Sequence, residues 1–111
     1  MNKQNYVYIL ASKRNGTLYV GVTSNLEKRI YEHKTKALKG FTDKYEIGHL
    51  VWFEKHGTIA SAILREKQIK KWNRQWKLRL IENNNSNWED LSEKLFDWIP
   101  AFAGMTGQGR G

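Results

Sequence analysis

The sequence of 111 residues contains no cysteine, which excludes disulfide bonds, zinc–thiolate sites and thiol catalysis. It has one proline, Pro100, and no apolar run near the roughly 20 residues that a membrane-spanning helix needs. The apolar run at residues 7–11 is also too short for the core of a signal peptide. We therefore expect a cytoplasmic protein that does not enter a membrane.

Acidic residues are scarce in this chain. Asp and Glu number 11 against 19 Lys and Arg, which gives a net charge of +8 and a pI near 9.8. Such an excess of positive charge favours a polyanionic partner, nucleic acid before an anionic membrane surface, with a merely solubilising surface as the alternative. The length suits one domain with a single modest core.

Hydrophobic periodicity predicts three strands and several helices. The strands are residues 6–12, 17–23 and 49–54, and Asn15-Gly16 forms a hairpin turn between the first two. The helices are residues 24–37, opened by a Ser24–Glu27 capping box, 59–81 with a break near Trp72-Asn73, and 88–98. This order predicts an α+β domain over residues 1–98, with a small three-stranded, mostly antiparallel sheet flanked by helices. The glycine-rich residues 99–111 lack periodicity and are expected to be a disordered tail.

Two tyrosines stand on the predicted hairpin. Strand alternation places Tyr8 with Tyr6 on one face, and Tyr19 with Gly21 on one face of the next strand. We expect the aliphatic residues opposite them to supply the core and the tyrosines to face elsewhere, either at a site or as ordinary half-wet tyrosines. Gly21 is costly inside a strand unless a side chain or a ligand approaches the backbone there.

Three charged or titratable side chains stand out on the predicted helices. Arg29 and His33 are four residues apart and project from one helix face, either as surface residues or as a phosphate-binding pair. Glu66 stands among Ile59, Ala62, Ile63 and Ile69 on the apolar stripe of the long helix. A carboxylate in that place needs a partner, which is either Lys70 in an ion pair or a metal ion.

The second half of the long helix interleaves cations with tryptophans. Its basic side chains are expected to contact nucleic-acid phosphates, whereas Trp72 and Trp76 are expected to belong to the core more than to stack on bases. The predicted nucleic-acid contacts are Gly21, Lys67, Lys70, Lys71, Arg74 and Lys77.

Taken in order, these segments resemble the GIY-YIG nuclease superfamily. The resemblance is carried by YVY at residues 6–8, Tyr19-Val20-Gly21, and the pattern GVTxxLxxRxxxH over residues 21–33. It continues with LVWFE at 50–54, AxxREKQIKKWxRxxKxxLI at 62–81 and NWEDL at 87–91. It is nearest to the small stand-alone bacterial branch, which is related to the nuclease half of the excision-repair enzyme. In the first tripeptide Tyr6 replaces the motif glycine, while Tyr8 is kept.

The resemblance implies a metal-dependent endonuclease that hydrolyses DNA phosphodiester bonds, one strand per active site, with one Mg²⁺ or Mn²⁺ ion. RNA remains an alternative substrate. A catalytically inactive nucleic-acid-binding module, or a basic accessory protein in DNA repair or restriction, is the alternative function. By motif position the site residues are Tyr8, Tyr19, Arg29, His33 and the metal ligand Glu66, with Gly21 as the motif glycine.

Some roles stay open at this stage. Cations near a tyrosine lower its pKa, so either Tyr8 or Tyr19 is a candidate general base, with His33 accepting or relaying the proton. Gly21 is expected to leave room for the phosphate backbone. The family also has a late polar asparagine, for which Asn83, Asn84 and Asn85 compete.

Overall fold

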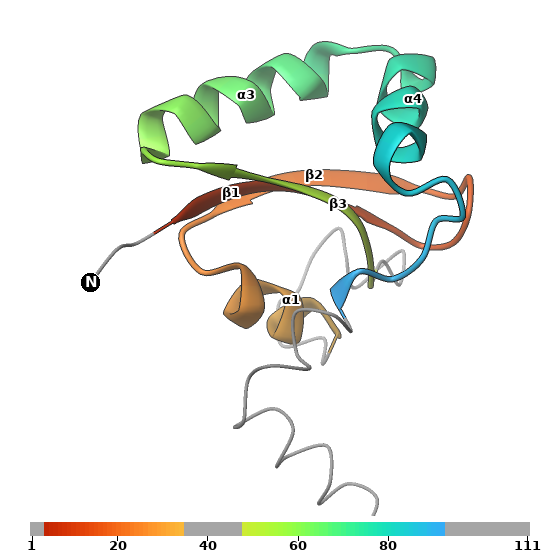
Figure 1. The fold of residues 1–111 in the computed structure, drawn as a ribbon, viewed down its shortest axis with the longest axis horizontal. Helices are drawn as coiled ribbons and strands as arrows, with labels where there is room; N and C mark the ends of the chain where they lie inside the picture. Colours follow the sequence, from red (N-terminus) through yellow and green to blue (C-terminus); the bar gives the residue numbers. More distant parts are fainter. Residues whose placement is uncertain (1–3, 35–47, 93–111) are drawn as a thin grey trace, which may run out of the picture.

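The computed structural model describes residues 4–34 and 48–92. Its three strands form one antiparallel sheet in the order β2-β1-β3, with helices on both faces (Figure 1). The strands are β1 (Asn5–Ala11), β2 (Leu18–Thr23) and β3 (His49–His56), and the helices are α1 (Leu26–Lys34), α3 (Ile59–Lys71) and α4 (Arg74–Asn84). The α+β class and the three-stranded antiparallel sheet are thus confirmed.

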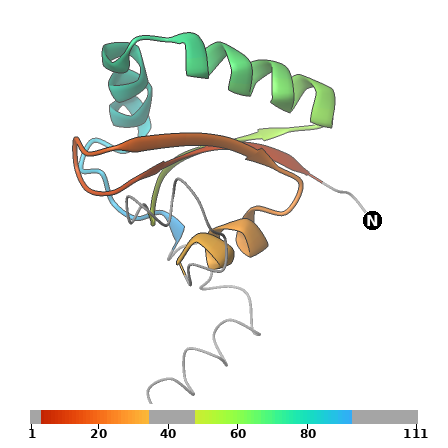
Figure 2. The ribbon, with the colours of Figure 1, turned by 180° about the vertical axis from the view of Figure 1, so that it is seen from behind.

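The sheet separates two layers of helices. Helices α3 and α4 lie over one face and α1 lies under the other, as the view from behind also shows (Figure 2). Residues 35–47 and 93–111 lie outside the described part, and with them the predicted end of the first helix and the predicted tail. Among the described residues, no helix is both long and apolar enough to cross a membrane.

Each sheet face has its own hydrophobic cluster. Val7, Ile9 and Val20 belong to the cluster under α3 and α4, as alternation predicted. The opposite face was expected to point its tyrosines elsewhere, and this is wrong for Tyr8. Its side chain is fully buried with Leu26 and Ile30 of α1. A sheet covered on both faces has no solvent-facing side, so alternation here distinguishes two cores and not a core from a surface.

The β1–β2 turn has the predicted Asn-Gly chemistry. Asn15 has a φ of 59°, and the Gly16 amide donates to the Lys13 carbonyl at 2.9 Å. One guanidinium nitrogen of Arg74, at the start of α4, donates to the carbonyls of both Asn15 and Gly16 at 2.7 Å. The turn is therefore fastened to the helical layer.

The helix ends follow side-chain capping. The predicted break near Trp72 is confirmed, because the Asn73 side chain accepts from the Trp76 amide and begins α4 there. Helix α1 was expected to begin with a capping box at Ser24. In the structure Asn25 is the cap, since its side-chain oxygen accepts from the Lys28 amide at 3.1 Å.

The helix predicted over 88–98 does not begin at Trp88. That residue has a φ of 57°, and the chain runs in an irregular path to Leu91, whose amide donates to the Leu50 carbonyl at 2.7 Å. Trp88 is buried in the cluster under α3 and α4, whereas Leu91 packs against the cluster beside α1. The two residues thus serve opposite faces of the sheet, which one helical stripe does not allow. The rest of this segment lies outside the described residues.

Candidate functional site

Tyr8 and Gly21 are direct partners across the β1–β2 ladder. A Cβ atom at position 21 would lie 2.6 Å from both the Cζ atom and the hydroxyl oxygen of Tyr8, and 3.1 Å from Cε2 of Tyr19. The glycine therefore makes room for the two phenol rings. Its predicted contact with a phosphate backbone stays a prediction, but the protein itself already requires the absence of a side chain there.

His33 completes an aromatic group with the two tyrosines. Its Nε2 atom lies 3.4 Å from the Tyr8 hydroxyl, at the long end of the hydrogen-bond range, and its ring centroid is 5.6 Å from that of Tyr19. The Tyr8 and Tyr19 rings are 6.3 Å apart and tilted by 43°. Strands β1 and β2 and helix α1 thus bring Tyr8, Tyr19 and His33 together, as the sequence predicted of one site.

The protonation of this group is set mainly by burial. Burial raises the pKa of Tyr8 well above its usual value of 10, and the Tyr19 phenol and the Glu66 carboxylate add to the rise. A hydrogen bond and the positive charge of Arg29 act in the opposite direction and are outweighed. Arg29 thus acts in the expected direction, but the net shift is upward, so the expectation of a Tyr8 pKa below its usual value is wrong in this structure.

The pKa of His33 is shifted in the opposite direction, downward. Its ring is 6% exposed, and burial lowers its pKa below 6.5, with the positive charge of Arg29 adding to the shift and Glu32 opposing it. The imidazole is therefore neutral at pH 7. A neutral imidazole beside a protonated phenol forms a proton-accepting pair.

Arg29 of α1 acts electrostatically on both Tyr8 and His33. Its side chain is 40% exposed, and its Nε atom lies 3.5 Å from the Glu32 carboxylate. It also borders a polar hollow of about 140 Å³ over the first turn of α1. The hollow is lined by Thr23, Ser24, Asn25, Lys28, Arg29 and Glu32. This environment suits the oxygens of a phosphate group.

Glu66 lies on the sheet side of α3 with 12% of its side chain exposed, and its Oε2 atom is 2.6 Å from the Lys70 ammonium. The ion pair considered from sequence is therefore present. The apolar stripe around Glu66 is narrower than predicted, because Ala62 and Ile69 are buried while Ile59 and Ile63 are exposed. The Glu66 charge, on a helix of the opposite layer, still contributes to the raised pKa of Tyr8.

The oxygen donors suit one hard divalent cation. Mg²⁺ in nucleases keeps several waters and takes one or two carboxylates, and Glu66 offers one nearly buried carboxylate. No cluster of three or more His, Cys, Asp or Glu side chains occurs within residues 4–34 and 48–92. The residues therefore fit a site for one hydrated Mg²⁺ or Mn²⁺, and not a fully ligated zinc site.

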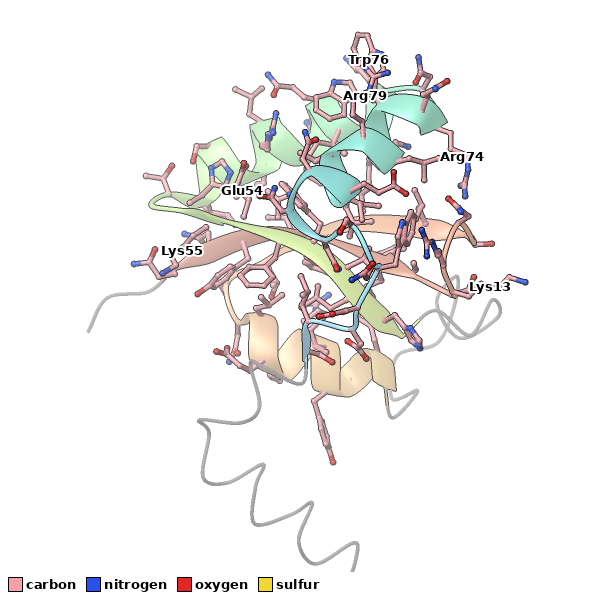
Figure 3. The ribbon with its side chains drawn as sticks, turned by 45° about the vertical axis from the view of Figure 1, so that its right-hand side comes forward. Lys13, Glu54, Lys55, Arg74, Trp76 and Arg79 are labelled. Carbon is pink, nitrogen blue, oxygen red and sulfur yellow. The ribbon has the colours of Figure 1, made fainter. Side chains whose placement is uncertain are left out.

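The predicted basic contacts do not form one surface. Lys70 and Lys77 line a groove of about 370 Å³ along the outer strand β2, together with Leu18, Tyr19 and Val20. Arg74 donates to the carbonyls of the hairpin turn, and Figure 3 shows it on the side of the molecule that carries Lys13. Lys67 and Lys71 are exposed on α3. The groove thus connects two of the five predicted cations with one of the site tyrosines.

Two features were missed or left open by the sequence. Glu54 binds His56 at 2.7 Å and Arg65 at 3.1 Å, so it fastens β3 to α3; only its i, i+2 spacing to His56 hinted at this contact. Among the late asparagines, Asn85 is buried and Asn83 and Asn84 are exposed. The Asn85 amide donates to the Val51 carbonyl at 3.1 Å, which gives it a structural role.

Trp76 corrects another expectation. The two helix tryptophans were expected to belong to the core, which holds for the half-buried Trp72 but not for Trp76, which is 52% exposed. The helix break at Asn73 changes the direction of the chain between them, so one periodic stripe does not describe both residues.

Comparison with known proteins identifies the family of this chain. The sequence model described as the GIY-YIG catalytic domain, an endonuclease-type family, matches residues 4–79. That range contains every predicted catalytic, metal and basic contact residue, from Tyr8 to Lys77. GIY-YIG nucleases generally depend on a divalent metal and act on nucleic acid.

Several full-length relatives carry the name UPF0213 protein. The one from Syntrophus aciditrophicus is 42% identical over 82 residues, covering 73% of this chain and 93% of its own. The one from Clostridium perfringens is 40% identical over 95 residues, covering 82% of this chain and 97% of its own. A solution NMR structure of the UPF0213 protein from Bacillus halodurans has a TM-score of 0.49 and 24% identity, covering 78% of this chain and 92% of that one. The chain belongs to the GIY-YIG family, among its UPF0213 proteins.

Proposed function

We propose that this protein is a divalent-metal-dependent endonuclease that hydrolyses DNA phosphodiester bonds, one strand per active site. The observation that carries the proposal is the convergence of Tyr8, His33 and Arg29, with the Glu66 charge acting on the same phenol. Core packing explains a buried tyrosine, but it does not explain an imidazole 3.4 Å from its hydroxyl together with a guanidinium and a carboxylate whose charges act on its pKa.

Arg29 is the phosphate-binding residue of this proposal. Its fork is fixed in charge and partly open to solvent beside the polar hollow on α1. Charge that develops on the phosphoryl oxygens in the transition state is stabilised there without reorganisation of the protein. The Glu32 carboxylate holds the guanidinium in place from the side of the helix.

Tyr8 and His33 together take the proton from the attacking water. The Tyr8 phenol is protonated at neutral pH, so it is not a base by itself. As its oxygen accepts the water proton, its own proton passes to Nε2 of the neutral His33, 3.4 Å away. This distance has to shorten in the substrate complex, as catalytic hydrogen bonds in ligand-free sites commonly do.

Glu66 would hold the divalent ion, which when bound supplies charge stabilisation at the phosphoryl group. With the ion bound, Lys70 would release the carboxylate and contact a phosphate in the groove along β2. Tyr19 lines that groove and also packs against Tyr8, so it orients the substrate strand over Tyr8. The substrate strand then runs along the groove, between Lys70 and Lys77 on one side and the two tyrosines on the other.

The test is cleavage of supercoiled plasmid, single-stranded DNA and single-stranded RNA with Mg²⁺ or Mn²⁺, against the same reactions in EDTA. We expect DNA cleavage that Glu66→Gln and Arg29→Ala each reduce by roughly 10²-fold or more. Glu89→Gln, an exposed carboxylate outside the site, is the matched control. Circular dichroism checks that each variant is folded.

Two outcomes overturn the proposal. One is a purified wild type that cuts none of the three substrates, and the other is Glu66→Gln cutting at the wild-type rate. The alternative, a binding module without catalysis, is favoured by the 2.6 Å ion pair that occupies Glu66. It predicts that the wild type binds DNA without cutting and that Glu66→Gln leaves this binding unchanged.

A further inference from the structure

A second groove lies on α4, outside the site described above. It has a volume of about 230 Å³ and is lined by Trp72, Trp76, Arg79, Leu80 and Asn83. Figure 3 shows Trp76 and Arg79 together on the outer side of this helix. None of these residues takes part in the proposed chemistry, so the groove needs its own explanation.

The indole rings of Trp72 and Trp76 differ in burial and in their contacts. Trp72 is half-buried against the core, and the Arg65 guanidinium lies 5.3 Å from the centre of its ring. Trp76 meets Trp72 edge to face, with centroids 5.8 Å apart and an interplanar angle of 78°. Because it is 52% exposed, Trp76 presents ring surface to solvent while Trp72 fixes its orientation. An oriented, exposed indole is a stacking platform.

The charge around the groove selects the kind of partner. Residues 65–81 contain seven Lys and Arg side chains and one acid, Glu66, which is paired with Lys70. Arg79 adds a cation inside the groove, and Asn83 adds an amide that both donates and accepts hydrogen bonds. An exposed indole with a cation beside it in the same groove suits a ligand with planar rings and negative charge, which describes nucleic acid better than an apolar peptide.

We infer that this groove binds an unpaired base of a single-stranded nucleic acid, stacked on Trp76. This inference rests on the proposed function in that it gives the substrate a single-stranded region beside the cleavage site. Arg79 contacts the phosphate or the base plane, and the Asn83 amide reaches the base edge. Bases within a duplex are already stacked on both sides, so a platform of this kind favours unpaired ones.

The groove is placed to act with the active site. Trp76 and Lys77 are consecutive on α4, so they point about 100° apart on the same turn. Lys77 faces the groove along β2 with Lys70 and Tyr19, while Trp76 lines the groove on the outer side. A strand crossing α4 between these residues has its phosphates near Lys77 and a base over Trp76.

The experiment measures binding in EDTA, so that it does not depend on cleavage. Fluorescence anisotropy follows a labelled oligodeoxythymidine of roughly ten nucleotides, long enough for one small domain, and a duplex of equal length. Trp76→Ala should weaken binding of the single strand by between about 5-fold and about 150-fold, and binding of the duplex much less. Trp76→Phe, which keeps an aromatic ring, should stay close to the wild type.

Two further measurements identify stacking as the cause. An abasic oligonucleotide should bind the wild type no better than oligodeoxythymidine binds Trp76→Ala. The salt dependence should have the same slope in the wild type and in Trp76→Ala, because stacking releases no counterions, whereas Arg79→Gln should make the slope shallower. Leu64→Ala removes another exposed apolar side chain, 61% exposed on α3, and should change nothing.

The inference is overturned if Trp76→Ala binds the single strand like the wild type, or loses single-strand and duplex binding equally. It is also overturned if sedimentation shows that the wild type dimerises and Trp76→Ala does not, since the groove then binds a second copy of the chain. Failure of the proposed endonuclease is a separate result. It appears as absent cleavage, while Trp76-dependent binding in EDTA persists.

Discussion

The hydroxyl end of Tyr8 occupies the space that a side chain at position 21 would need, with both its Cζ and its oxygen 2.6 Å from that Cβ position. Tyr8 is fully buried between the sheet and α1, so it has no open space to move into. The motif glycine and the motif tyrosine are therefore one packing unit. Through it, strand β2 fixes the position of the phenol that faces His33.

Gly21→Ala is expected to destabilise the protein by about 1–3 kcal/mol, because the added methyl group forces the Tyr8 ring or the strand to shift. Urea denaturation measures the change. Gly57→Ala is the matched control, since a Cβ at that exposed glycine has no atom within 4 Å. Equal stability of Gly21→Ala and the wild type would show that Tyr8 does not depend on the glycine.

The lowered pKa of His33 predicts a pH-dependent stability. Because the folded-state pKa is below 6.5, the unfolded chain binds the proton of this histidine more readily than the folded chain does. The contribution of His33 to the free energy of unfolding is therefore fully present above pH 6.5. It decreases as the pH falls from 6.5 toward the folded-state pKa. Urea denaturation from pH 7.5 to pH 5 measures this slope. His33→Gln should flatten it, and His49→Gln, at an exposed histidine, should not. A slope unchanged in His33→Gln would exclude this residue as its source.

Local patterns predicted much of the fold. Strand alternation assigned Tyr8, Val20 and Gly21 to the correct faces, because the period of a strand is set by the backbone. The helix break at Asn73 was also predicted, since an asparagine there caps a new helix. Capping does not select between two adjacent cap-competent residues, and Asn25 was therefore missed in favour of Ser24.

The misses share a physical reason. Arg74 binds carbonyls 58 and 59 residues away, and no spacing in the sequence encodes that contact. The raised pKa of Tyr8 depends on how completely α1 covers it, which alternation does not give. Sequence patterns thus proposed the candidate site residues and the Glu66–Lys70 ion pair, whereas the burial and the protonation of Tyr8 required the folded chain.

In the proposed metal site, Lys70 would compete with the divalent cation for Glu66. Its ammonium is 2.6 Å from the carboxylate and 53% exposed, so it pairs with Glu66 at modest strength. Lys70→Met should therefore raise the affinity of the DNA-free protein for Mn²⁺ by roughly twofold to tenfold. Titration calorimetry or Mn²⁺ electron paramagnetic resonance measures it without any cleavage assay.

The control for Lys70 is Lys67→Met, which removes an exposed cation from the same helix without breaking the Glu66 ion pair. A general effect of net charge would raise Mn²⁺ affinity equally in both variants. An affinity that stays at the wild-type value in Lys70→Met would show that the cation does not bind at Glu66. Glu66→Gln should abolish the high-affinity binding of Mn²⁺ when it is combined with either Lys70→Met or Lys67→Met.

Asn85 is expected to be the structurally essential member of the late asparagine run. Its side-chain amide donates to the carbonyls of Val51 and Glu89, and its side-chain oxygen accepts from the Glu89 amide at 2.9 Å, so it joins β3 to the segment that follows α4. Asn85→Ala removes the side-chain partner of the buried Val51 carbonyl and of the partly buried Glu89 backbone groups, and should cost about 2–4 kcal/mol in urea denaturation. Asn84→Ala, one residue earlier and exposed, should stay within about 0.5 kcal/mol of the wild type. Similar losses in both variants would mean that helix termination, and not this hydrogen-bond network, is what the asparagines provide.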